Sequence, residues 1–306
     1  MASTAVTLLF VSLLVFVVVR VLPGDPALVM LGIEASPQAV AALRESLGLN
    51  RPVPVQYLQW VGRAALGDLG RSIQYDVPVA GLVLSRLSVT LPLTLMAAGF
   101  MVLAAVPLGV FAATYHRCWG DYVTMTLSQL GIAVPGFWAG LLLILLFSVK
   151  LGWFQAGGFD GWGQGVGGAL KSLLLPAVAL GLFQFAVLAR TTRSALLEVL
   201  REEYVKTARA KGVAEPGVLF RHALRNAMIP ILTVAGVQLG QLMAGSIILE
   251  SVFYLPGLGR LALGAISARD LPVVQGVVLF VASVIVGINA AVDVLYGVLD
   301  PRIRYD

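Results

Sequence analysis

The chain has 306 residues, of which 58% are hydrophobic and only 12% are charged, with a mean hydropathy of +0.91. A soluble domain usually carries about twice that share of charge, so the composition excludes an ordinary soluble protein and indicates a chain that crosses a membrane several times. The single cysteine, Cys118, excludes an intramolecular disulfide and a cysteine-based metal site, and a net charge of +5 is too small to indicate nucleic acid as a partner.

Six segments are long and apolar enough to cross a bilayer core, which takes about 20 apolar residues in a helix. They cover residues 4–22, 87–115, 122–151, 173–193, 228–249 and 273–299. Several contain proline, including Pro135 in the third. Membrane helices tolerate proline because neighbouring helices satisfy the freed backbone groups. The sequence therefore predicts an all-α membrane protein with about six transmembrane helices in one domain, residues 1–306.

The first segment lacks the basic start and the cleavage site of a secretory signal peptide, so we interpret it as a span. The loop that follows, residues 23–86, is expected to be helical and to lie outside the cell. Ser36 and Pro37 match an N-cap followed by proline at the first helical position, and Gly48 matches a helix stop. A second short helix is expected at residues 55–66. The loop either caps the spans or offers a docking surface to an external partner.

Residues 163–172 contain Gly163, Gly165 and Gly168 in the G-x-G-x-x-G spacing of dinucleotide-binding proteins. No predicted strand precedes these glycines, and the segment falls on the outer side between two spans, so we expect a flexible loop rather than a nucleotide site. The phosphate-binding pattern G-x-x-x-x-G-K-[ST] does not occur in the chain. The chain therefore cannot hydrolyse ATP alone.

The connection between the fourth and fifth spans is dense in cations. These are Arg190, Arg193, Arg201, Lys206, Arg209, Lys211, Arg221 and Arg225. Together with Arg117 after the second span and Arg302 and Arg304 in the C-terminal tail, they fall on one side of a six-span protein. Because cytoplasmic loops carry an excess of Lys and Arg, both termini and this loop are expected in the cytoplasm.

This charged loop, residues 198–227, is predicted to form two short helices. The first covers residues 202–211 and ends at Gly212, and the second covers residues 218–227 after a turn at Pro216 and Gly217. Glu203 and Lys206 have the spacing of a helical charge pair. The loop is either a positive anchor at the membrane surface or a docking site, and the small residues between its cations favour docking.

Two sequences in this loop, YVKTARAKG at 204–212 and RHALRNAMIP at 221–230, resemble the cytoplasmic EAA loop of permease subunits of bacterial ABC importers. The nearest branch transports dipeptides, oligopeptides, glutathione or nickel. Lys206 stands where the wider family has an acidic residue, as is usual for this branch. Five further stretches resemble its first permease subunit, namely LPGDPA at 22–27, LGLNRPVPVQYLQW at 47–60, GDLGRS at 67–72, ESVFYLPGLGRL at 250–261 and DPRIRY at 300–305.

The resemblance implies a MetI-like ABC permease fold in the bacterial cytoplasmic (inner) membrane. It implies four kinds of partner: a second homologous permease, one or two kinds of cytoplasmic ATP-binding subunit, an extracytoplasmic substrate-binding protein and the lipid bilayer. ATP and Mg would be bound by the ATPase, and this chain would bind no cofactor or metal and catalyse no reaction. The residues expected to couple to the ATPase are Thr207, Ala208, Arg209, Lys211, Gly212, Arg221 and His222, with Ala208 and Gly212 permitting a close fit.

Polar residues inside the spans either line the translocation path or hydrogen-bond neighbouring helices as structural contacts. They are Gln129, Gln184, Gln238, Gln241 and Asn289. The resemblance suggests that Glu250 and the turn containing Pro256, Gly257 and Gly259 lie near an outer gate.

Two other classes of protein fit the sequence less well. A membrane enzyme would need clustered acids or a nucleophile with a base, and the loop offers neither. An ATP-independent secondary transporter or channel would favour ionisable residues at mid-membrane, and the centres of these spans have none. Peptide is the expected cargo, with glutathione or a nickel complex as the alternative on the same scaffold.

Overall fold

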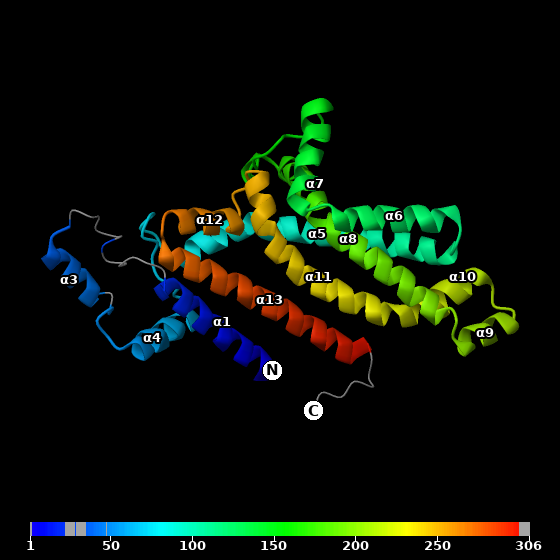
Figure 1. Cartoon of the computed structure of the whole chain (residues 1–306), viewed down its shortest axis with the longest axis horizontal. Coiled ribbons are helices and arrows are strands. Elements are labelled where there is room, and N and C mark those ends of the chain that lie inside the picture. The colour runs from blue at the N-terminus through cyan, green and yellow to red at the C-terminus, as the bar shows by residue number, and fades with distance from the viewer. Residues whose placement is uncertain (1, 22–27, 29–34, 47, 300–306) are drawn as a thin grey trace. The chain divides into compact units, whose positions relative to one another are not determined.

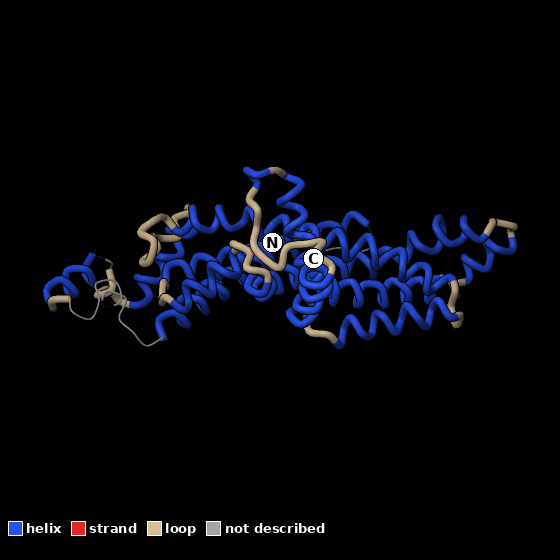
Figure 2. Tube along the Cα trace, turned by 90° about the horizontal axis from the view of Figure 1, so that it is seen from above, coloured by secondary structure: helices blue, strands red, loops and turns tan. Residues whose placement is uncertain are grey.

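The computed structural model describes residues 2–21, 28, 35–46 and 48–299. Within these ranges every regular element is a helix, apart from one isolated bridge between Arg71 and Pro78 (Figure 1, Figure 2). The predicted all-α fold is therefore confirmed. The stretches at 22–27 and 300–305, with Arg302 and Arg304, lie outside the described residues.

The first half of the chain contains α1 (Ala2–Val21), α3 (Pro37–Ser46), α4 (Val53–Ala65), α5 (Val79–Thr114), α6 (Trp119–Ala133), α7 (Gly136–Leu143) and the π-helix η1 (Ile144–Lys150). The second half contains the short 3-10 helix η2 (Trp162–Gln164), α8 (Val166–Val199), α9 (Glu203–Ala210), α10 (Glu215–Gly217), the π-helix η3 (Val218–Ala223), α11 (Leu224–Val252), α12 (Leu258–Ser267) and α13 (Leu271–Leu299). These elements form two compact units, Met1–Val89 with Pro256–Val286 and Thr90–Leu255 with Gly287–Asp306.

In the described part of the chain, four helices are long and apolar enough to cross a membrane, and a fifth span results if α6 with α7 and η1 counts as one. The four are α5, α8, the run Glu215–Val252 and the segment Leu271–Val294 of α13. The expected first span is helical as α1, and its segment Thr4–Val18 ranks among the shorter apolar helices. The helices at the predicted spans are therefore present, but the third is not a single straight helix.

The third span is bent by 105° between α6 and α7. Val134 has φ −89° and ψ 120°, and Pro135 has φ −59° and ψ 137°, so both leave the helical region. The ring of a proline disfavours helical backbone at the residue before it. Figure 1 shows α7 rising steeply away from α6. Pro92, Pro107 and Pro176, in contrast, lie inside continuous helices.

Two other expectations are wrong. The glycine-rich segment is not a loop throughout, because α8 already begins at Val166, directly after the turn at Gly165 with φ +124°. The second helix of the charged loop is not separate either, because α10, η3 and α11 follow one another and count as one span, Glu215–Val252. Pro230, the third residue of the predicted span 228–249, therefore lies inside this longer helical run. In both places the next span is longer than hydropathy indicated.

In the first unit, the predicted helices after the first span are present as α3 and α4, and Gly48 has the expected left-handed φ of +69°. Helix α4 packs on α1 through Tyr57, whose hydroxyl lies 2.8 Å from Ser12 Oγ. A buried cluster joins the start of α5 to α12 and α13. Its members are Val79, Val83, Leu258, Leu261, Ala262, Ala265, Val273 and Val277.

In the second unit, α8 contacts both α6 and α11 (Figure 1). Its core joins α5, α8 and α11, with Met101, Leu188, Leu196 and Ile231 among the buried residues. Helices α5 and α8 approach so closely that a Cβ added at Gly109 would stand 2.7 Å from the Ala189 carbonyl oxygen. Small residues allow such contact between membrane helices.

Candidate coupling site

Helix α9 follows α8 after a link of residues 200–202. Glu202 precedes it with an extended backbone (φ −65°, ψ 146°), and Lys211 ends it. Gly212 then takes φ +81°, the left-handed conformation in which helices commonly end and which favours glycine. The predicted helix and its glycine stop are therefore present in the structure.

The inner face of α9 packs on its own chain. Val205 and Ala208 are buried with Val218 of η3, and Val199 and Leu200 at the end of α8 pack against them. A close fit between Ala208 and a partner would require this residue at the surface, but Ala208 is buried. Its small side chain instead lets α9 approach η3.

Charged and polar side chains brace the loop on its outside. Arg209 Nε donates to Glu215 Oε1 at 2.8 Å and its Nη2 to Oε2 at 3.3 Å, across the turn at Gly212. Lys206 Nζ donates to Glu203 Oε1 at 2.7 Å, which is the pair that the sequence predicts. All four side chains are exposed, so each pair contributes about 0–1 kcal/mol.

The other predicted coupling residues divide by exposure. Thr207, Lys211, Gly212 and Arg221 are exposed, whereas His222 is half-buried. Three exposed apolar residues in the same region were not predicted, and they are Tyr204, Val213 and Phe220. The outer surface of the loop is therefore both cationic and partly apolar.

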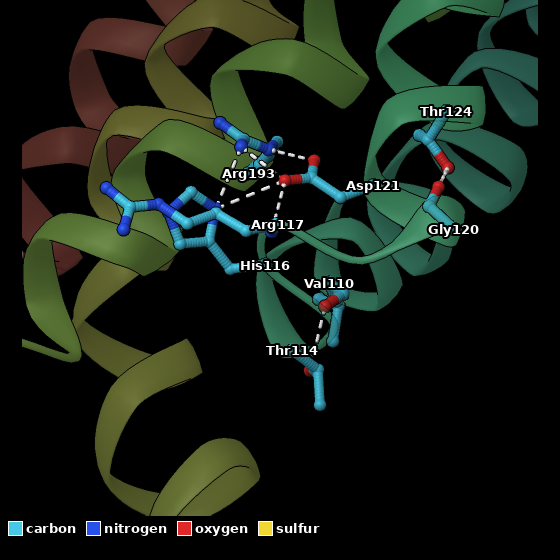
Figure 3. A network of polar contacts seen from close by, with 8 residues as sticks. All are labelled: Val110, Thr114, His116, Arg117, Gly120, Asp121, Thr124 and Arg193. Atoms are coloured by element: carbon cyan, nitrogen blue, oxygen red, sulfur yellow. Dashed lines mark hydrogen bonds and ion pairs between the residues drawn. The ribbon is translucent and has the colours of Figure 1, made fainter.

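Behind the loop, a buried ion pair joins two helices that sequence reasoning did not connect (Figure 3). Arg193 of α8 donates from Nε to Asp121 Oδ1 at 2.5 Å and from Nη2 to Oδ2 at 2.6 Å. The backbone N–H of Arg117, whose φ is +64°, also donates to Oδ2 at 3.0 Å. The Asp121 side chain is only 4% exposed, so three donors satisfy a carboxylate that is nearly withdrawn from solvent.

His116 completes this network. Its Nδ1 lies 3.0 Å from Arg193 Nη2 and 3.1 Å from Asp121 Oδ2. Nδ1 can accept a hydrogen bond from Arg193 Nη2, because an arginine only donates, or donate one to Asp121 Oδ2, and the tautomer of the ring decides which. In Figure 3 the imidazole lies beside the guanidinium, on the turn between α5 and α6. We call Asp121, Arg193, His116 and the Arg117 backbone the α6–α8 clasp.

The predicted path residues do not form one group. Gln184 and Gln238 are buried, whereas Gln129, Gln241 and Asn289 are exposed. Gln184 Oε1 has no hydrogen-bond partner among the described residues, and neither has Ser128 Oγ, which is also buried. Burial alone therefore does not assign Gln184 and Gln238 a role between helices, whereas Gln129, Gln241 and Asn289 are free to face a path or a neighbouring subunit.

The predicted gate residues lie in consecutive segments. Glu250 is fully buried at the end of α11 and accepts a hydrogen bond from Thr90 Oγ1 at 2.6 Å. Gly257 precedes the first residue of α12, and Gly259 lies in its first turn. Among the described residues, no group of three or more His, Cys, Asp or Glu side chains could hold a metal ion.

Comparison with known proteins identifies this arrangement. Residues 105–305 match the family model described as binding-protein-dependent transport system inner membrane component, and residues 1–94 match the corresponding N-terminal model. A Brucella abortus protein named for a peptide transport system permease is 46% identical over 305 residues, covering 100% of this chain and 97% of the relative. The glutathione transport system permease protein GsiC of Salmonella choleraesuis is 44% identical over 299 residues, covering 98% and 95%.

Among solved structures, the inward-facing MetNI methionine ABC transporter matches 72% of this chain and 96% of its own, with a TM-score of 0.58 at 20% identity. This likeness shows the fold alone. The chain belongs to the family of binding-protein-dependent transport system inner membrane components, the permease subunits of ABC importers. The family is a non-catalytic membrane component of bacterial inner membranes, and its membership sets aside the membrane enzyme and the ATP-independent transporter.

Proposed function

We propose that this chain forms half of the translocation pathway of an ATP-driven importer of di- and oligopeptides. A second homologous permease supplies the other half, and an extracytoplasmic substrate-binding protein delivers the cargo. One or two kinds of cytoplasmic ATPase subunit bind ATP and Mg and drive the transport. The whole-length similarity to a protein named for peptide transport supports the cargo.

The observation that carries the proposal is the construction of the charged loop. Its inner face is fixed by Val205, Ala208 and Val218, while its outer face leaves Lys211, Arg221 and the apolar Phe220 to a partner. A plain membrane anchor would need the charges but not a helix that packs on its own chain through one face. We assign this outer face to a groove on the ATPase, with both termini in the cytoplasm.

ATP and the loaded binding protein need only favour one arrangement of the permease pair over the other to drive transport. The exposed Gln129, Gln241 and Asn289 are the better candidates for the path or the contact with the second permease. The buried Gln184 and Gln238 are withdrawn from the surface in this arrangement, so we do not assign them to that contact. Glu250 and the start of α12 are assigned to the outer gate.

The partnership is tested by co-purification. The tagged chain is extracted with its gene neighbours co-expressed, in mild detergent with ATPγS, and the bound proteins are identified by mass spectrometry. We expect a second permease and an ATPase, and we expect Gly212→Arg to lose the ATPase, because the substituted residue must adopt φ +81°. Gly62→Arg, at an exposed glycine of α4 with no atom within 4 Å of an added Cβ, is the matched control.

Recovery of this chain without an ATPase under every nucleotide condition would contradict the proposal. The cargo is tested separately, by uptake of labelled dipeptide, tripeptide and glutathione into cells that lack their own systems for them. Glutathione is the second candidate, because GsiC is nearly as similar to this chain as the Brucella relative. Uptake of glutathione without uptake of peptides would show that the cargo is glutathione, and it would leave the rest of the proposal unchanged.

A further inference from the structure

The α6–α8 clasp stands next to the root of the coupling loop. Arg193 lies near the end of α8, and the chain passes from there through residues 200–202 into α9. Val199 and Leu200 also pack against the buried face of α9. A displacement of α9 is therefore passed both to η3, through Val218, and to the end of α8 that carries Arg193.

At this position α8 is also closely packed on both sides. A Cβ added at Gly109 of α5 would stand 2.5 Å from Thr192 Cβ, and one added at Gly131 of α6 would stand 3.1 Å from Ala186 Cβ. Backbones in such contact leave little room for sliding. The clasp adds two directional hydrogen bonds, which fix the relative position of α6 and α8 more narrowly than apolar contact does.

Helix α6 leads onward to the bend and to α7. A Cβ added at Gly140 of α7 would stand 3.0 Å from Phe253 Cε2 and 3.2 Å from Leu249 Cδ1. Phe253 follows the end of α11, and its carbonyl oxygen accepts a hydrogen bond from Gly158 N at 2.8 Å. Packed side chains therefore connect α9, through α8, α6 and α7, to the opposite end of α11 within one compact unit.

We propose that Asp121 and Arg193 are positioning residues that make α6 and the bent third span follow the displacement of the coupling loop. The inference rests on the proposed ATPase-driven function. Stability alone does not account for the pair, because apolar residues of similar volume often hold a core as well as a buried ion pair does. What the charged pair adds is a fixed register between two helices.

The test uses the complete complex of permeases, ATPase and binding protein, reconstituted in liposomes. Asp121→Asn, Arg193→Gln and the double variant are compared with wild type for yield of assembled complex, unfolding temperature, ATP hydrolysis, and dipeptide uptake per ATP hydrolysed. The control is the Arg71→Gln, Asp76→Asn double variant, which removes an exposed ion pair with an N–O distance of 3.2 Å.

We expect both single variants to lower the unfolding temperature and the double variant to regain part of the loss. The double variant should assemble with the ATPase and hydrolyse ATP, but its uptake per ATP should fall about tenfold, whereas the control matches wild type. Full recovery of both stability and uptake per ATP in the double variant would overturn the inference, since the pair would then be only structural. Loss of the ATPase from the double variant would overturn it as well. A wild-type chain that binds no ATPase would instead refute the proposed function.

Discussion

Two glycines of α5 show how closely single residues fit this structure. A Cβ at Gly109 would meet Thr192 Cβ at 2.5 Å and the Ala189 carbonyl oxygen at 2.7 Å, whereas a Cβ at Gly99 would meet nothing within 4 Å. We therefore expect Gly109→Ala to destabilise the protein by about 1–3 kcal/mol through overpacking. Gly99→Ala should be neutral or slightly stabilising, because alanine favours a helix by up to about 1 kcal/mol. Thermal unfolding in detergent measures both, and equal unfolding temperatures would contradict the expected contact between α5 and α8.

A second prediction for a single residue concerns the hydroxyl of Thr90. Its hydroxyl donates to the fully buried carboxylate of Glu250 at 2.6 Å. Thr90→Val keeps the shape of the side chain and removes the donor, which should cost about 1–3 kcal/mol of stability. Thr233→Val is the control, because Thr233 is exposed and its hydroxyl bonds only a carbonyl of its own helix. Equal unfolding temperatures for the two variants would show that the Thr90 hydroxyl contributes nothing to stability.

At the scale of elements, α9 is held by apolar contacts more than by its charges. Val205 is fully buried, whereas Glu215 pairs with Arg209 in solvent. Val205→Ala should cost about 1–3 kcal/mol, and Glu215→Gln should cost less than about 1 kcal/mol. Hydrogen exchange of the α9 backbone amides measures the local stability of this helix. We expect a large loss of protection for Val205→Ala and not for Glu215→Gln. Greater loss in Glu215→Gln would mean that the ion pair holds the helix.

The sequence predicted helix ends correctly where the end depends only on the residues next to it. Gly212 and Gly48 end helices as expected because a left-handed residue is a local requirement. A proline by itself did not predict the bend at Pro135, since Pro92, Pro107 and Pro176 lie inside continuous helices. Pro135 differs from these in being followed by glycine, a turn dipeptide, and α7 then packs against Leu249 and Phe253.

The α6–α8 clasp was missed for a related reason. Asp121 and Arg193 are 72 residues apart, and no sequence pattern pairs residues at such a distance. Asp121 by itself indicates only a favourable acid in the first turn of α6. The usable signal was Arg193, a cation at the end of an apolar segment, because such residues usually have a specific partner. Identifying that partner required the fold.

For the whole molecule, the family and the fold are those that the sequence predicts. The side of the membrane on which the charged loop lies is a prediction that can be tested. The charged loop is expected in the cytoplasm because of its cations. The clasp brings the α5–α6 turn next to the end of α8 that leads into this loop. Cys118, the single cysteine of the chain, lies in that turn and is exposed. Cys118 should therefore report the same side of the membrane as α9.

A membrane-impermeant maleimide tests this orientation. We expect it to label Cys118 in inverted vesicles and not in intact cells with a permeable outer envelope. Further cysteines are introduced into a Cys118→Ser background. The start of α6 should tolerate this change, because Cys118 is its N-cap residue and serine is preferred there. In this background Thr207→Cys should be labelled from the same side as Cys118, and Gly62→Cys from the other side. Labelling of Cys118 and Thr207→Cys from outside would invert the topology and place the coupling loop beyond the reach of any cytoplasmic ATPase. Labelling of these two positions from opposite sides would instead contradict the contact between α6 and α8 that the clasp requires.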